Sequence, residues 1–196
     1  MNFCSSISKQ EMSALPVEIF HGDIIVVDNH NAVRKAVAYL SAFDCVGFDT
    51  ETRPNFTKHQ HHKVALIQLS TSDRCYLFRL NKLRGIPKRL EDFLIHGNTV
   101  KVGLSLLDDF HNIRKSMDFN PDNFIDLQKV VPSYGIQEAS LQKIYAILFG
   151  KKISKRMRLS NWETDVLSDP QKQYAAIDAW ACLQIYKQLN QTNELL

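Results

Sequence analysis

The first half of the chain shows two periodic patterns of hydrophobic and polar residues, one with the spacing of a helix and one with the spacing of a strand. Residues 28–43 repeat their apolar positions at helical spacing after polar capping residues, which predicts an amphipathic helix. The run 44–54 then alternates with a period of two, as a half-buried strand does. Two further strand-like runs, 63–71 and 74–80, are separated only by a short polar turn, which predicts an antiparallel hairpin. Together the three strands are expected to form a meander.

From residue 87 onwards, helices alternate with short strands. A helix is predicted over 87–97, because proline stands at its start and glycine at its end, and a strand is predicted over 100–105. The remaining segments are predicted to be a helix over 108–117, a strand over 124–128 and helices over 140–150 and 168–189. This order predicts an α/β fold, in which helices pack against a mixed sheet.

The composition is that of a globular domain. Of the 196 residues, 44% are hydrophobic and 23% are charged. No apolar run approaches the ~20 residues that span a bilayer, and the start of the chain does not resemble an export signal, so we expect a cytoplasmic protein without membrane contact. No repeat or linker divides the chain. We therefore expect one domain over residues 19–196, preceded by a polar segment, 1–18, that packs loosely.

The net charge and the cysteine content exclude few kinds of partner or site. The net charge of +3 permits a polyanionic partner without requiring one. The cysteines are scattered, with no zinc-type spacing, and are interpreted as reduced thiols, mostly in the core. They are Cys4, Cys45, Cys75 and Cys182.

Two acids end the strand-like run 44–54. The period of two places Gly47, Asp49 and Glu51 on one face of the strand. Neighbouring carboxylates raise each other's cost of ionisation unless a cation neutralises them, and a divalent metal ion would do so. The alternative is a pair of acids in a solvated turn, because a short motif of this kind also arises by chance.

The final helix carries a third acid in its apolar stripe. Ser168 and Gln171 stand at the capping-box positions that define its start. Tyr174 and Asp178 then fall at helical spacing on the face expected to pack on the core. Asp178 is therefore either a buried acid held by hydrogen bonds or a ligand, and Tyr174 is either core or part of a site.

A fourth acid position lies where the strand over 100–105 runs into the next helix. Asp108 and Asp109 open that helix, where acids commonly serve as caps or interact favourably with the helix dipole. Taken with the other acids, this position points to carboxylates that converge at one edge of the sheet and hold two cations.

Three segments together resemble a known enzyme family. FDTETRP, VKVGLSLLDDFHNI and RLSNWETDVLSDPQKQYAAIDAW are similar to the three motifs of the DEDD-superfamily 3'-5' exonucleases, in the Tyr-containing branch related to ribonuclease D and the Werner-type exonuclease domain. The resemblance extends from about Asp23 to Leu189. Asp109 is favoured over Asp108 as the acid of the middle motif, because Phe110 and Ile113 after it match the family pattern.

The resemblance implies a fold, a reaction and a set of ligands. The fold would be ribonuclease-H-like, with an antiparallel meander, parallel strands and flanking helices. Asp49, Glu51 and Asp178 would bind one divalent ion, Mg²⁺ or Mn²⁺, and Asp49 would bridge to a second ion that Asp109 helps to hold. Tyr174 would position the attacking water. The enzyme would release nucleoside 5'-monophosphates from the 3' end of DNA or RNA.

Two other functions remain open at this point. The same fold without turnover would be a nucleic-acid-binding or scaffold module. An endonuclease of this fold is the second alternative, and circular or end-blocked substrates would distinguish it from an exonuclease.

A basic run ahead of Trp162 is the candidate substrate-binding segment. Its cations are Lys151, Lys152, Lys155, Arg156 and Arg158. We expect Lys155, Arg156 and Arg158 to follow a phosphate backbone and Trp162 to offer a stacking surface, whereas the alternative is a solvated charged face. The resemblance also places Thr52, just beyond the strand acids, near the terminal nucleotide.

Other polar clusters are given structural interpretations. His59, His61 and His62 are expected in a solvated loop, because no second ligand group stands at a recognisable metal spacing. Asp126 is expected to be a strand-end or capping residue.

Overall fold

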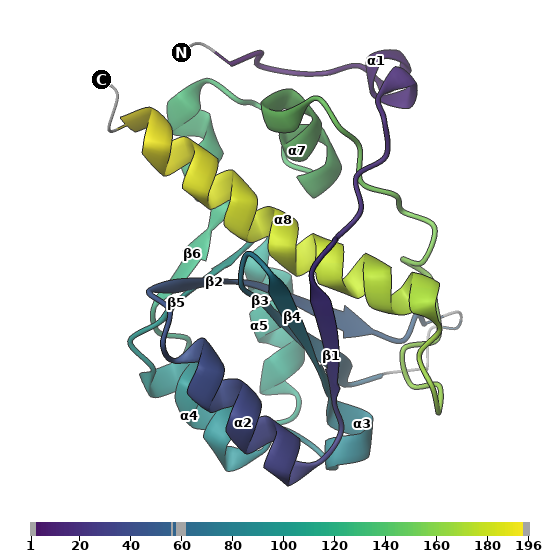
Figure 1. Cartoon of the computed structure of the whole chain (residues 1–196), viewed down its shortest axis with the longest axis vertical. Helices are drawn as coiled ribbons and strands as arrows, with labels where there is room; N and C mark the ends of the chain where they lie inside the picture. Colours follow the sequence, from purple (N-terminus) through teal and green to yellow (C-terminus); the bar gives the residue numbers. More distant parts are fainter. Residues whose placement is uncertain (1–2, 56, 58–61, 194–196) are drawn as a thin grey trace.

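The fold is built around a mixed β-sheet of six strands, which Figure 1 shows at the centre of the molecule. The computed structural model describes residues 3–55, 57 and 62–193. The strands follow the order β1-β4-β3-β2-β5-β6 across the sheet. Their bounds are β1 Asp23–Val27, β2 Cys45–Thr52, β3 Val64–Ser70, β4 Arg74–Arg79, β5 Val100–Gly103 and β6 Phe124–Asp126.

The strand pairing confirms the α/β fold and the mixed sheet. β2, β3 and β4 form the predicted antiparallel meander, and β5 and β6 extend the sheet in parallel beyond β2. β1 pairs in parallel with β4. β1 was not predicted, although its run of β-branched residues is typical of a buried strand.

Helices connect and cover the strands. Their bounds are α1 Lys9–Ala14, α2 His30–Leu40, α3 Leu80–Leu83, α4 Lys88–His96, α5 Leu106–Arg114, α6 Leu127–Val130, α7 Leu141–Phe149 and α8 Asp169–Asn193. All the predicted helices form, whereas α1, α3 and α6 are too short to show a periodicity in the sequence. Among the described residues, no helix is both long and apolar enough to cross a membrane.

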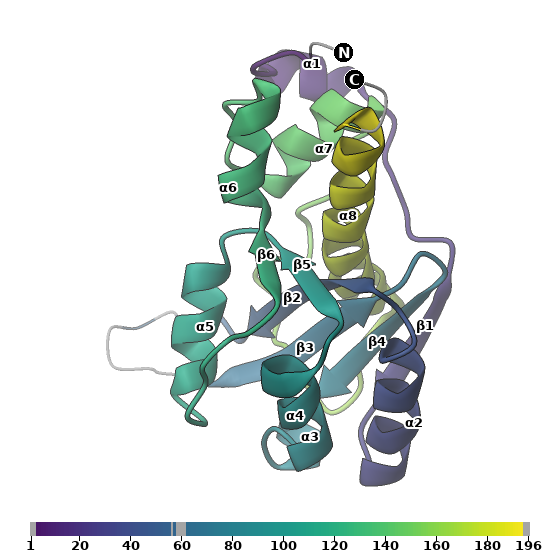
Figure 2. The same ribbon diagram turned by 90° about the vertical axis from the view of Figure 1, so that its left-hand side faces the viewer.

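The sheet separates two hydrophobic layers. α7 and α8 lie on one side of it, and α2, α4 and α5 lie on the other, as Figures 1 and 2 show. Leu66 and Leu77 belong to the core beneath α8, whereas Phe48, Phe78 and Phe110 belong to the core on the opposite face. Two cores result because successive side chains of a strand point to opposite faces.

Gly47 in β2 lets the backbone of α8 pack directly against the sheet. A Cβ atom built on this glycine would lie 1.9 Å from the carbonyl oxygen of Ala179 in α8. Only glycine permits the helix backbone to come this close to β2. The contact places Asp178, the neighbour of Ala179, beside the acidic end of β2.

Most described residues of the N-terminal segment are exposed, as expected of a segment that packs loosely, but individual contacts tie it to the rest of the molecule. The Gln137 amide donates to the Ser5 carbonyl oxygen at 2.8 Å. Glu18 is buried, and its carboxylate accepts a hydrogen bond from the Tyr145 hydroxyl at 2.9 Å. These contacts are between residues far apart in the sequence, which is why local polarity did not reveal them.

Lys101 is an unusual member of the core. Its side chain in β5 is fully buried, and its Nζ lies 3.5 Å from the Phe93 carbonyl oxygen and 4.9 Å from the centre of the Phe124 ring. Burial lowers the pKa of this ammonium group to about 8. The carbonyl and the aromatic ring offset only part of the cost of removing the charge from water.

We predict that Lys101→Met raises the free energy of unfolding at pH 7 by on the order of 3 kcal/mol, because each unit of pKa change corresponds to about 1.4 kcal/mol. Below pH 8 the lysine is charged in both folded and unfolded chains, so the full penalty applies. The penalty falls as the pH rises from about 8 to 10.5, where the unfolded chain also loses the proton.

Urea unfolding at pH 7 and at roughly pH 9.5 measures this difference, and the gain should fall by more than half at the higher pH. Lys88→Met is the matched control, because the Lys88 side chain is 70% exposed and its removal should change little at either pH. An equal gain at both pH values would show that Lys101 carries no buried charge.

Candidate active site

Three carboxylates converge between β2 and α8. Asp49 and Glu51 lie on the face of β2 that α8 covers, and Asp178 faces them from the helix. One carboxylate oxygen from each residue lies within 4.8 Å of the others, and this is the sole such group of metal-ligating side chains in the described part of the chain. Asp178 is only 5% exposed. The predicted convergence of the strand acids with the final helix is thus present in the structure.

The electrostatics of the cluster favour neutral carboxyls unless a cation is present. Burial, together with the charges of Asp109, Asp178 and Glu51, raises the pKa of Asp49 well above its usual range. Burial raises the pKa of Glu51 to about 9, and the charges of Asp178 and Asp109 add to this effect. Burial also raises the pKa of Asp178 to about 7. A divalent cation would offset both causes, because it stabilises the ionised form.

Asp109 approaches from the other side of the sheet. It lies in the first turn of α5, and its carboxylate accepts a hydrogen bond from the hydroxyl of Thr50, which points to the opposite face of β2 from Asp49. Burial raises the pKa of Asp109 to about 7, whereas the Thr50 hydrogen bond lowers it. Asp108 is exposed. Asp109, rather than Asp108, is therefore the partly buried acid of this helix, and its charge raises the pKa of Asp49 and Glu51.

Asp126 fixes the start of α5. Its carboxylate accepts hydrogen bonds from the backbone amides of Ser105 and Leu106 at 3.0 and 3.1 Å, and from that of Gln128 at 3.0 Å. The prediction of a strand-end capping residue is confirmed. By holding both α5 and α6, Asp126 fixes the turn of helix that carries Asp109.

Tyr174 and Trp162 form a buried pair next to Asp178. The Tyr174 hydroxyl is hydrogen bonded to the Asp178 carboxylate one turn further along α8 and lowers the pKa of that group. The Tyr174 ring lies 6.0 Å from the Trp162 ring, with 34° between their planes. Trp162 is fully buried, so the prediction that it offers a stacking surface to substrate is wrong. Its indole instead supports Tyr174.

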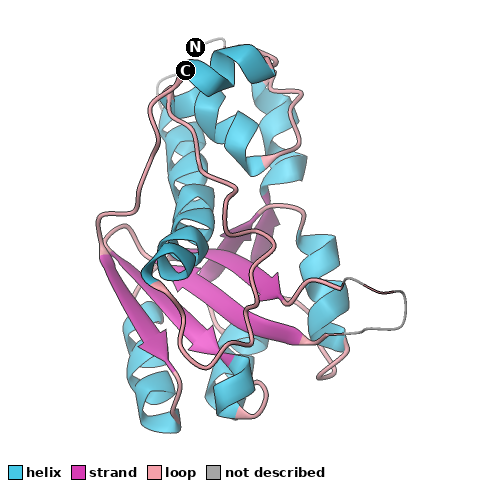
Figure 3. Ribbon diagram, turned by 90° about the vertical axis from the view of Figure 1, so that its right-hand side faces the viewer, coloured by secondary structure: helices cyan, strands magenta, loops and turns pink. Residues whose placement is uncertain are grey.

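The segment that contains Trp162 contacts both the start of α8 and the chain that follows β2. The connection from α7 to α8 passes beside the sheet before α8 begins (Figure 3). The Gln171 side chain donates to the Asn161 carbonyl oxygen at 3.1 Å and caps α8 together with Ser168, which confirms the predicted capping box. Glu163 pairs with Arg53 at 3.3 Å and with His62 at 3.4 Å. These pairs join the chain after β2 to the start of α8.

The pairing of Arg53 with Glu163 has no signal in the local sequence, because both residues lie in irregular segments. Of the three loop histidines, His62 is held by Glu163, and His59 and His61 lie outside the described residues. The four cysteines form no disulfide, and Cys75 and Cys182 are buried, whereas Cys45 is half-buried and Cys4 is exposed, so the prediction of core thiols holds for two of the four.

The basic run divides into two parts. Lys151 pairs with Glu18 at 3.0 Å, and Lys152 donates to the Ser13 carbonyl oxygen, so both are tied to the N-terminal segment. Lys155 and Arg158 are exposed, and their charges lower the pKa of Asp178 and Glu51 respectively. The second part of the run is therefore within electrostatic reach of the acidic cluster.

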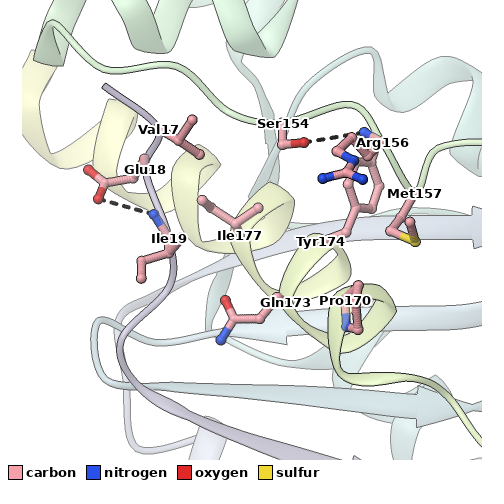
Figure 4. A pocket seen from close by; sticks show the side chains of 10 residues that line it. All are labelled: Val17, Glu18, Ile19, Ser154, Arg156, Met157, Pro170, Gln173, Tyr174 and Ile177. Carbon is pink, nitrogen blue, oxygen red and sulfur yellow. Dashed lines mark hydrogen bonds between the residues drawn. The ribbon is translucent and has the colours of Figure 1, made fainter. Parts of the chain in front are cut away.

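Two concave surfaces are lined in part by residues described above. Figure 4 shows a mainly apolar hollow of about 220 Å³ beside the start of α8, with Arg156, Met157 and Tyr174 in its wall. A polar hollow of about 550 Å³, lined in part by Lys63 and Arg84, adjoins the start of β3. Thr52 is half-buried at the end of β2, directly after Glu51. Lys155, Arg156 and Arg158 are exposed, and their contact with substrate stays a prediction, as does that of Thr52.

The donor set fits a hard divalent cation. All the converging ligands are carboxylate oxygens, which Mg²⁺ and Mn²⁺ prefer, and no thiolate or imidazole is part of the group of three. Asp178 Oδ1 is buried without a hydrogen-bond partner. A buried carboxylate oxygen without a partner is costly, and a bound cation would satisfy it.

Known proteins similar to this chain are described as 3'-5' exonucleases. A family model described as 3'-5' exonuclease matches residues 24–194. The chain is 33% identical over 155 residues to the mouse bifunctional 3'-5' exonuclease/ATP-dependent helicase WRN, a match that covers 76% of this chain and 11% of the mouse protein. It is 35% identical over 154 residues to a 3'-5' exonuclease of Arabidopsis thaliana, covering 74% of this chain and 52% of that protein.

The fold also resembles solved exonuclease structures. The Trypanosoma brucei RNase D complex with RNA U12 superposes with a TM-score of 0.74 at 18% identity, covering 87% of this chain and 63% of that one. This likeness supports the expected ribonuclease-H-like architecture. The family model extends over most of the chain and includes the converging acids of β2, α5 and α8. The chain therefore belongs to the 3'-5' exonuclease family.

Proposed function

We propose that this chain is a metal-dependent exonuclease that hydrolyses phosphodiester bonds from the 3' end of a nucleic acid and releases nucleoside 5'-monophosphates. The observation that carries the proposal is the convergence of Asp49, Glu51 and Asp178, which a divalent cation would stabilise. The activity is assigned to residues 19–196 as one domain. Cytoplasmic localisation stays a prediction.

The carboxylates would hold two divalent ions. Asp49, Glu51 and Asp178 would bind one ion, and Asp49 would share the second with Asp109. Bound Mg²⁺ or Mn²⁺ would make water a stronger nucleophile at neutral pH and stabilise charge on the leaving 3' oxygen. Thr50 holds the Asp109 carboxylate by a hydrogen bond and so limits its rotation. Asp126 holds the helix that carries it.

Tyr174 is assigned the positioning of the attacking water. Burial and then the charges of Asp178 and Glu51 raise the pKa of its phenol, so the hydroxyl keeps its proton at neutral pH. Trp162 packs against the ring, and the hydrogen bond with Asp178 sets the direction of the hydroxyl. A neutral hydroxyl in a fixed position can orient a water molecule without adding charge to the cluster.

Lys155 and Arg158 are assigned to the phosphate backbone of the substrate. Both cations are exposed, and their charges act on Asp178 and Glu51, so they would meet the phosphates of a substrate bound at the cluster. Arg156, in the wall of the adjoining hollow, and Thr52, beside Glu51, complete the proposed contacts. The solved relative with bound RNA supports a nucleic-acid substrate, which the proposal extends to DNA or RNA.

The proposal predicts shortening of a 5'-labelled oligonucleotide from its 3' end in the presence of Mg²⁺ or Mn²⁺. Asp49→Asn and Asp109→Asn should lower the rate by more than about 10²-fold, because loss of a partner one shell further from a metal already costs 10–100-fold. Asp108→Asn is the matched control. It neutralises the adjacent exposed acid and should keep activity near that of the wild type.

Other outcomes of this assay are equally informative. Cleavage of circular or 3'-blocked substrates would identify an endonuclease instead. A folded protein that binds oligonucleotides but degrades neither DNA nor RNA with either ion would be a binding module. Equal loss of activity in Asp108→Asn and Asp109→Asn would contradict the assignment of the middle acid.

The basic run gives a separate prediction about salt. Replacing Lys155, Arg156 and Arg158 by alanine should flatten the plot of log affinity against log salt by about 0.7 per lost phosphate contact on a single strand, or roughly two in total. Binding should be measured in an Asp49→Asn background with Ca²⁺ to prevent turnover. The double variant Lys151→Ala, Lys152→Ala is the control, because both ammonium groups are held by the N-terminal segment. An unchanged slope in the triple variant would exclude this path.

A further inference from the structure

One buried side chain beside the acidic cluster has no partner. Gln68 lies in the middle of β3, directly opposite Asp49 of β2 in the antiparallel pair. Side chains of such a pair point to the same face, so Gln68 faces α8 as Asp49 does. Gln68 is fully buried, and neither its Nε2 nor its Oε1 has a hydrogen-bond partner among the described residues.

An amide without partners is out of place in this strand. The neighbours of Gln68 along β3, Ile67 and Leu69, are fully buried apolar residues, and Leu77 lies opposite it on β4. An apolar side chain of similar volume would fit the same core without leaving a donor and an acceptor unsatisfied. The buried Gln68 amide is costly without a hydrogen-bond partner. Asp49 stands directly opposite it on β2, and its carboxylate can accept a hydrogen bond from the amide.

We propose that Gln68 is a positioning residue for Asp49, whose carboxylate accepts a hydrogen bond from the Gln68 amide when divalent cations occupy the site. The inference rests on the proposed function, in which both ions share Asp49. A glutamine suits this position because its amide donates a hydrogen bond without carrying charge. A lysine or arginine would neutralise the carboxylate and repel the cations.

The orientation of Asp49 matters more than that of the other acids. A carboxylate that serves two ions must present its oxygens in two directions, so rotation about its side-chain bonds lowers affinity at both positions. Partners of this kind, one step removed from the metal, commonly change metal affinity by 10–100-fold. The Thr50 hydroxyl already holds Asp109 in this way, and Gln68 would do the same for Asp49.

The test compares Gln68→Met with Gln142→Met. Methionine keeps the length of the side chain and removes the amide, and Gln142 is a buried glutamine of α7. Calorimetric titration with Mn²⁺ should show affinity about 10- to 100-fold weaker in Gln68→Met and unchanged in Gln142→Met. Without metal, Gln68→Met should be at least as resistant to urea as the wild type, because an unsatisfied amide is lost.

The outcomes separate this inference from the proposed function. Equal Mn²⁺ affinity in the wild type and Gln68→Met would overturn the role of Gln68 while the metal site stands. A wild-type protein that binds no Mn²⁺ would overturn both. If Gln68→Met does not fold, the side-chain amide resonances of Gln68 in the ¹⁵N-labelled wild type decide the matter: they should shift when Mg²⁺ is added, and unmoved resonances would overturn the inference.

Discussion

The contact between Gly47 and the backbone of α8 is the constraint on which the site depends. Because Gly47 has no side chain, the Ala179 carbonyl can rest against β2, and Asp178 then meets Asp49 and Glu51. Any larger residue would push the helix away and separate the acids. The same close packing buries the carboxylates, so the geometry that assembles them also makes their ionisation costly. A site built in this way requires cations to be stable in its charged form.

Much of this arrangement could be predicted from local sequence. Alternation along β2 places Asp49 and Glu51 on one face, and helical spacing in α8 places Asp178 in a buried stripe. The capping box at Ser168 fixed the start of α8 and hence the register of Asp178. These predictions succeeded because each depends on a repeat or a cap within a few residues, and such patterns determine which way a side chain points.

The failures concern contacts between distant segments. Trp162 follows a basic run, which suggested a surface for substrate, but packing against Tyr174 buries it. Gln68 is a single polar residue in an apolar strand, and its significance depends on the register that sets it opposite Asp49. Glu163 pairs with Arg53 more than a hundred residues away. Such pairings are set by the fold as a whole, so short-range patterns do not reveal them.

The central claim is that the carboxylates from both sides of the sheet form a site for two cations. Anomalous diffraction from crystals soaked in Mn²⁺ tests it most directly, because each bound ion appears as a separate peak. We expect one peak among the oxygens of Asp49, Glu51 and Asp178 and a second between Asp49 and Asp109. Crystals of active protein that show no anomalous peak at these carboxylates would contradict it.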